Sequence, residues 1–97
     1  MIKLFKSVDD KLSDLGFAKI MDEDADDFYG VSYARYIQEY GYNQRLDIMY
    51  KASGRHLIQS YQEDTNSDGY NNVVGLTYKE TKLAMKKYRQ MKRKYKW

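Results

Sequence analysis

The C-terminal segment, residues 76–97, constrains the fold more than any other part of the chain. It contains no Gly and no Pro, and Thr77 is followed three residues later by Glu80, which is the capping-box pattern that begins helices. We therefore expect one long C-terminal helix. Small and apolar side chains recur along it at spacings of three and four, which predicts the side that packs on the rest of the protein. These residues are Thr81, Ala84, Tyr88, Met91 and Tyr95.

The opposite side of this predicted helix is basic. Residues 76–97 hold nine Lys or Arg against one Glu, whereas residues 9–30 hold eight acids against two Lys. The net charge of +3 therefore hides two blocks of opposite sign. From the sequence, the basic side either faces a partner or docks on the acidic loop at residues 22–27, and both arrangements stay open.

Three segments in the middle of the chain have the composition of β-strands. Residues 28–37 are rich in aromatic and β-branched side chains, residues 44–52 alternate apolar with polar ones, and residues 55–62 follow after a turn. The Gly-containing turns between them predict an antiparallel meander. Residues 73 and 74, both Val, predict either a brief strand or a buried plug.

The strand predicted at residues 44–52 alternates between two faces. One face carries Leu46, Ile48 and Tyr50, and the other carries Arg45, Asp47 and Lys51. Such a strand is half-buried, and its polar face lies in water. We expect that face of the sheet to be partly open and to carry several Tyr. It is therefore a candidate surface for self-association.

A short helix is expected near the start of the chain. Ser7 is suited to its N-cap and Gly16 to its C-cap, with apolar residues at helical spacing between them. Residues 17–21 then predict a short strand. Together these elements predict an α+β fold, in which the two helices pack on a three- to four-stranded antiparallel meander sheet. The length fits a single domain over residues 1–97.

Few residues are available for catalysis. The chain has no Cys and a single His, His56, which excludes disulfides, thiolate metal sites and Cys nucleophiles. Ser53 and Ser60 lie near His56 in the sequence and Asp47 lies in the preceding predicted strand, but no oxyanion site is predicted beside them. No phosphate-binding Gly loop, HExxH motif or nucleotide fingerprint is present. We expect a protein that is not an enzyme and has no cofactor.

The compartment is predicted from the same composition. No segment is apolar and long enough to span a bilayer, and charges interrupt the N-terminal residues too often for a signal peptide. The absence of Cys favours a reducing compartment. We expect a cytoplasmic protein that does not bind membranes.

The basic helix face is the stronger of two candidate binding features. Clustered cations on one face neutralise phosphates and release counterions, and Tyr side chains can stack on exposed bases. The same pattern is typical of the solvated face of an amphipathic helix, so both interpretations stay open. The candidate nucleic-acid-binding residues span about 26 Å at helical rise. They are Lys79, Lys82, Lys86, Arg89, Arg93 and Lys96.

The second feature resembles part of a calcium loop. Residues 64–69 match the first six positions of an EF-hand loop, with Asp64, Asn66 and Asp68 at ligand positions and Gly at the sixth. The twelfth position is Gly75 instead of the bidentate Glu that completes the coordination sphere, and the preceding segment is predicted as strand. An ordinary polar turn explains the same residues, so calcium binding is the minor alternative.

Two stretches carry a resemblance to other proteins. They are GRHLIQSY at residues 54–61 and NSDGYNNVVGLT at residues 66–77. In these stretches the chain resembles small uncharacterised proteins of Gram-positive bacteria and their phages. The resemblance runs from the strand at residue 28 into the last helix. It implies a cytoplasmic, prophage-encoded accessory protein, and it implies no activity and no functional residues.

The leading expectation is a non-catalytic binding or accessory domain that acts through protein contacts, with a homodimer as one form. It depends on the open sheet face and on the lack of catalytic groups. Nucleic-acid binding through the basic helix is the alternative.

Overall fold

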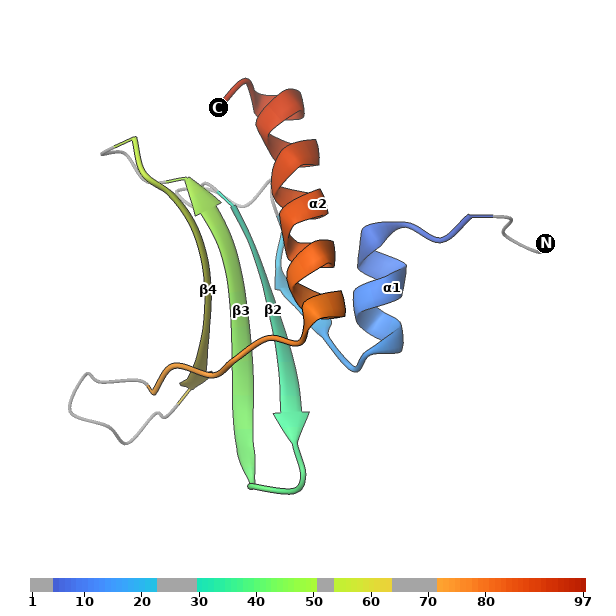
Figure 1. The fold of residues 1–97 in the computed structure, drawn as a ribbon, viewed down its shortest axis with the longest axis vertical. Coiled ribbons are helices and arrows are strands. Elements are labelled where there is room, and N and C mark those ends of the chain that lie inside the picture. Colours follow the sequence, from blue (N-terminus) through green and yellow to red (C-terminus); the bar gives the residue numbers. More distant parts are fainter. Residues whose placement is uncertain (1–4, 23–29, 51–53, 64–71) are drawn as a thin grey trace.

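The structure is a computed structural model, and it describes residues 5–22, 30–50, 54–63 and 72–97. Its elements in chain order are α1 (Val8–Asp14), β1 (Ala18–Met21), β2 (Gly30–Ile37), β3 (Tyr42–Tyr50), β4 (His56–Glu63) and α2 (Tyr78–Tyr95). The strands form one four-stranded sheet in the order β1-β2-β3-β4, and each strand is antiparallel to the next. The predicted α+β fold, a meander sheet with one short and one long helix, is confirmed (Figure 1).

Both helices begin where the sequence predicts. The Ser7 side chain accepts a hydrogen bond from the Asp10 backbone N–H at 3.0 Å, and the Asp10 carboxylate accepts one from the Ser7 backbone N–H at 3.3 Å, which completes a capping box. Thr77 and Glu80 form the same box at the start of α2. Gly16 ends α1 with a φ of 93°, a left-handed value that favours Gly over residues with a Cβ.

The core lies between the two helices and one face of the sheet. Val31 pairs with Ile48, and Tyr33 pairs with Leu46, so these four side chains project from the same face and form one core with residues of both helices. Burying each such side chain contributes about 1.5–3 kcal/mol. The buried apolar residues are Val8, Leu12, Phe17, Val31, Tyr33, Leu46, Ile48, Leu83, Ala84 and Met91.

The prediction of which α2 residues face the core is wrong in part. Ala84 and Met91 are buried and Tyr88 and Tyr95 are half-buried, as expected, but Thr81 is exposed. In its place Glu80, Leu83 and Lys87 are buried. The apolar pattern missed two of these residues because they are charged, and a charge is buried in a protein only when a partner neutralises it.

Two smaller expectations are also corrected. β3 begins at Tyr42, two residues before the predicted start, because the turn occupies residues 38–41. Val73 forms an isolated antiparallel bridge with Tyr61, and residues 73 and 74 form no strand. Val73 itself is exposed and is therefore not a buried plug.

The sheet face away from the helices differs from the expectation of a wet, Tyr-rich surface. Side chains alternate between the two faces of a strand, which puts Arg45 and Asp47 on this face as predicted. Asp47, however, is only 4% exposed. Of the Tyr residues in the described strands, Tyr36 and Tyr61 are the two that lie on this face. The face therefore presents a polar cluster more than an aromatic surface.

Candidate nucleic-acid interface

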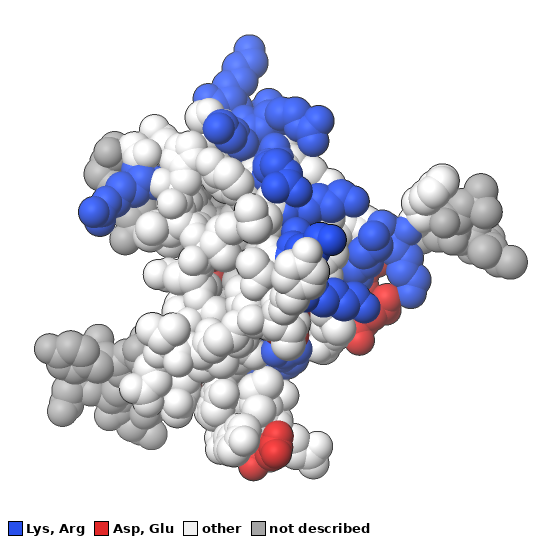
Figure 2. Space-filling view, in the orientation of Figure 1, with Lys and Arg blue, Asp and Glu red and all other residues white. Residues whose placement is uncertain are grey.

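The six cations predicted on the basic face all point outward. Lys79, Lys82, Lys86, Arg89, Arg93 and Lys96 are exposed, and Lys92 and Lys94 beside them are exposed too. Figure 2 shows a continuous band of Lys and Arg side chains that follows α2 and extends toward α1. We call the six predicted residues the basic face. The arrangement follows from α2 itself, because residues at spacings of three and four lie on one side of a helix.

The basic face is not neutralised by the acids that the structure describes. Within residues 5–22, 30–50, 54–63 and 72–97, none of its six residues forms an ion pair. Of the acidic loop expected to dock there, Asp22 is described, and its carboxylate lies 3.7 Å from Lys19 Nζ. Residues 23–27 lie outside the described residues.

Lys87 is the cation of α2 that turns inward. Its side chain is 11% exposed, and its Nζ lies 3.3 Å from a carboxylate oxygen of Asp9 in α1. Asp9 also accepts hydrogen bonds from the Tyr33 hydroxyl in β2 and, at 2.9 Å, from Lys19 in β1. Burial favours the neutral form of Asp9, but these hydrogen bonds and the charge of Lys87 outweigh it and hold the pKa of Asp9 below its usual value. The carboxylate therefore ties both helices to the sheet.

A second inward charge fixes the start of α2. Glu80 accepts a hydrogen bond from the Thr77 backbone N–H at 2.9 Å and one from Arg35 at 2.7 Å. Burial raises the pKa of Glu80, and the hydrogen bonds from Thr77 and Arg35 lower it by more, so its pKa lies below the usual value. Arg35 also donates to Gln44 Oε1 at 2.6 Å and to the Leu15 carbonyl at 3.1 Å. These contacts hold the basic face in a fixed orientation on the sheet.

Two connected hollows lie between α1 and α2, beside the basic face. The first, about 580 Å³, is lined by Lys6, Lys11, Asp14, Tyr78, Lys79, Lys82 and Leu83. The second, about 450 Å³, shares Lys11, Lys82 and Leu83 with the first and continues along α2 to Arg89. Asp14 is the one acid among the lining residues, and it pairs with Lys6 at 2.6 Å. We call these hollows together the interhelical groove, and its lining carries more cations than acids.

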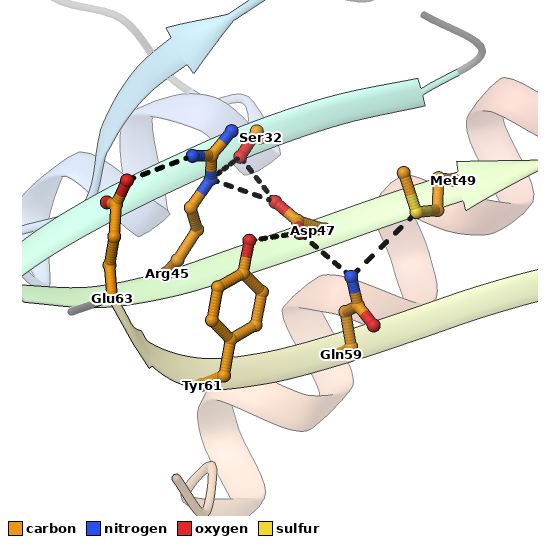
Figure 3. Close-up of polar contacts among 7 residues, drawn as sticks. All are labelled: Ser32, Arg45, Asp47, Met49, Gln59, Tyr61 and Glu63. Atoms are coloured by element: carbon orange, nitrogen blue, oxygen red, sulfur yellow. Dashed lines mark hydrogen bonds and ion pairs between the residues drawn. The ribbon is translucent and has the colours of Figure 1, made fainter. Parts of the chain in front are cut away.

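The polar cluster on the opposite face of the sheet is a different kind of site (Figure 3). Asp47 accepts hydrogen bonds from Ser32, from Tyr61 at 2.8 Å and from Gln59 at 3.0 Å, and its carboxylate lies 3.3 Å from Arg45 Nε. Burial and the hydrogen bond to Asp47 raise the pKa of Tyr61 to about 12. With four donors around it, the carboxylate is already satisfied, so the cluster rigidifies this face and offers no free base.

Of the residues considered for Ser-His-Asp chemistry, the three that the structure describes, His56, Ser60 and Asp47, do not form a triad. The Nδ1 atom of His56 forms a hydrogen bond with the Tyr88 hydroxyl, on the side of the sheet that faces the helices. The Ser60 hydroxyl instead accepts a hydrogen bond from Gln44 at 2.9 Å, and Asp47 lies on the opposite face. Ser53 lies outside the described residues. His56 belongs to an aromatic cluster with Tyr50, Tyr88 and Trp97, which secures the last turn of α2.

The proposed calcium ligands Asp64, Asn66 and Asp68 lie outside the described residues. Among the residues that are described, no three His, Asp or Glu side chains come together as a metal site. No helix in the described part of the chain is both long enough and apolar enough to cross a membrane.

Sequence reasoning found the basic face but missed the contacts that position it. The sequence analysis predicted no long-range partner for the four charged residues Asp9, Arg35, Glu80 and Lys87. A signal was present for one of them, because Glu80 at the third position of a capping box points back toward the helix start. For the others the partners are far apart in the chain.

Comparisons with protein-family models, with curated protein sequences and with solved structures found no match to this chain.

Proposed function

We propose that the protein is a non-catalytic module that binds nucleic acid through the basic face of α2. The observation that supports this most is the outward, unpaired state of all six cations within the described part of the chain. A solvated helix face without a binding role would gain from interspersed acids, which lower self-repulsion. After Glu80, which points inward, α2 has none.

The dimensions of the basic face fit a phosphate backbone. Its length of about 26 Å matches roughly seven phosphates along one strand of a duplex at 3.4 Å each. Side chains on one side of a protein helix reach only some of these phosphates, about four to six. Such a contact set gives sequence-independent binding, with dissociation constants of about 10⁻⁴ to 10⁻⁶ M at physiological salt.

The proposal is tested with two triple variants of equal net charge. Lys82→Gln, Lys86→Gln and Arg89→Gln remove three charges from the basic face. Gln38→Glu, Arg55→Gln and Asn72→Glu change the charge by the same amount at exposed positions outside α2. Both variants have a net charge of zero instead of +3. Each replacement is at an exposed site, so both should fold.

We expect the first variant to bind a duplex oligonucleotide at least about tenfold more weakly than wild type. The slope of log K against log salt should also become shallower by about 3, because about one counterion is released per phosphate contact. The second variant should keep most of the wild-type slope. Equal losses in the two variants would contradict the proposal, because net charge alone would then explain the binding.

A protein contact is the second candidate function, and it is supported by the outer edge of β4, which no described strand covers. Ser60 and Gln62 on this edge bond to the segment at residues 72–74. Residues 56–59 have no strand partner on that side among the described residues, and Ile58 is exposed there. An unpaired strand edge is a template for pairing with a second strand. We therefore propose a homodimer through β4 as the alternative, within a cytoplasmic accessory role.

Sedimentation measures this alternative directly. If β4 pairs across a dimer, wild type should show a concentration-dependent increase in mass in the micromolar range, and Ile58→Lys should remain a monomer because a charge on an edge strand opposes pairing. A wild-type protein that stays monomeric at high micromolar concentration contradicts the dimer.

A further inference from the structure

The interhelical groove combines cations with an exposed aromatic ring. Tyr78, at the first turn of α2, is 79% exposed and lines the groove. Lys82 Nζ lies 5.2 Å from the centre of its ring, so the ring and a cation are presented together. Leu83, which is buried, adds an apolar wall. An occupant that matches this lining has a flat apolar part and a negative part, as a nucleotide has.

We propose that the interhelical groove binds an unpaired nucleotide of a single-stranded nucleic acid, with its base stacked on Tyr78 and its phosphates on Lys79, Lys82 and Lys11. This inference rests on the proposed function and adds the substrate class to it. The groove continues past Leu83 to Lys86 and Arg89, so the following phosphates reach further cations of the basic face.

Preference for a single strand follows from the chemistry of Tyr78. In a duplex the faces of the bases are covered by their neighbours, and only phosphates are available to the lysines. In a single strand a base is free to stack, and one base–aromatic contact strengthens binding by roughly 5-fold to 100-fold. The phosphate contacts are shared by both substrates, so the aromatic contact decides between them.

The test compares wild type with Tyr78→Ala on two probes, a thymidine oligonucleotide and a duplex of equal length. We expect wild type to bind the single strand more tightly than the duplex. Tyr78→Ala should weaken single-strand binding by about 5-fold or more and leave duplex binding within about twofold. Tyr78→Phe should retain single-strand binding, because stacking needs the ring and not the hydroxyl. Tyr40→Ala is the matched control, since Tyr40 is 71% exposed and lies in the β2–β3 turn.

The charge lining the groove gives an independent readout. Asp14 pairs with Lys6 and is the groove's acid. Asp14→Asn should therefore strengthen single-strand binding by about twofold to fivefold. A Tyr78→Ala variant that binds both probes as wild type does, or that loses both equally, overturns the groove proposal and leaves the proposed function standing. Absence of salt-dependent binding to either probe overturns the proposed function itself, as does binding to anionic lipid vesicles without binding to either oligonucleotide.

Discussion

Lys86 and Lys87 are neighbours in the chain and have opposite surroundings. Lys86 points outward in the basic face, whereas Lys87 is buried against Asp9. The same division holds along the whole of α2. Each inward charge, Glu80 or Lys87, meets an opposite charge from another element, and the outward cations of the basic face meet none in the described part of the chain. The inner side of the helix therefore stabilises the fold, and the outer side is the one that we propose binds nucleic acid.

The largest effect is expected from the inner side. Glu80→Ala leaves Arg35 largely buried without its carboxylate and removes half of the capping box. We expect the free energy of unfolding to fall by about 3–5 kcal/mol, as measured by urea denaturation. Lys79→Ala, one residue away and exposed, is the control and should change it by less than about 0.5 kcal/mol. If both variants lost a similar amount of unfolding free energy, the inner charges would not differ from the outer charges in their contribution to stability.

The adjacent lysines give the sharpest comparison. Lys87→Ala removes one of the groups that neutralise Asp9 together with a buried aliphatic stem, and should lower the free energy of unfolding by about 1–2 kcal/mol. Lys86→Ala should be nearly neutral for unfolding, within about 0.5 kcal/mol, and should weaken binding to a duplex oligonucleotide instead. An Ala variant of Lys87 that binds weakly and unfolds normally would reverse the assignment of the two residues.

Acid should act on the same inner charges. The pKa values of Asp9 and Glu80 are depressed by folding, so near pH 4 the unfolded state binds more protons than the folded state. Their stabilisation is therefore complete above their ordinary pKa values of 3.8 and 4.5, and is lost as the pH falls through the lower folded values. Thermal denaturation between pH 6 and pH 3 measures this loss.

The matched variant for this pH series is Asp9→Asn combined with Glu80→Gln. It should start from a lower melting temperature and show a shallower decrease toward pH 3 than wild type. A decrease as steep as that of wild type would mean that other carboxylates carry the acid sensitivity, and that the inner charges do not.

The smallest expected effect is at the end of α2. Lys96 has a φ of 55°, in the left-handed region, and its backbone N–H bonds to the Lys92 carbonyl to close the helix. A residue with a Cβ is strained there, so Lys96→Gly should raise the free energy of unfolding by about 0.5–1 kcal/mol. It should also weaken oligonucleotide binding slightly, because it removes one outward cation. A destabilised glycine variant would show that the lysine side chain contributes to the cap.

Local signals in the sequence were enough to predict the elements. The capping residues Ser7 and Thr77 mark both helix starts, and the alternation at residues 44–52 marks the central strand. The basic face was predicted because helical spacing alone gathers its cations on one side. Each of these signals is contained within a few neighbouring residues.

The parts that the sequence did not predict depend on partners distant in the chain. Asp9 and Lys87 are brought together by the packing of α1 on α2, and Arg35 meets Glu80 through the packing of α2 on the sheet. Asp47 lies at a position of β3 that the alternating pattern assigns to the exposed face. It is nevertheless buried, and β2, β3 and β4 each supply a donor to its carboxylate. Burial of a charge is decided by its partner, and a single strand or helix pattern carries no information about that partner.

Chemical-shift mapping of the isotope-labelled protein shows which surface contacts nucleic acid. On addition of a single-stranded or duplex oligonucleotide at low salt, we expect shifts concentrated at Lys79, Lys82, Lys86, Arg89 and Arg93, reversed by high salt, with the Asp47 cluster unaffected. Shifts concentrated on the sheet face that carries Asp47, or no shifts at any salt concentration, would contradict the proposed function.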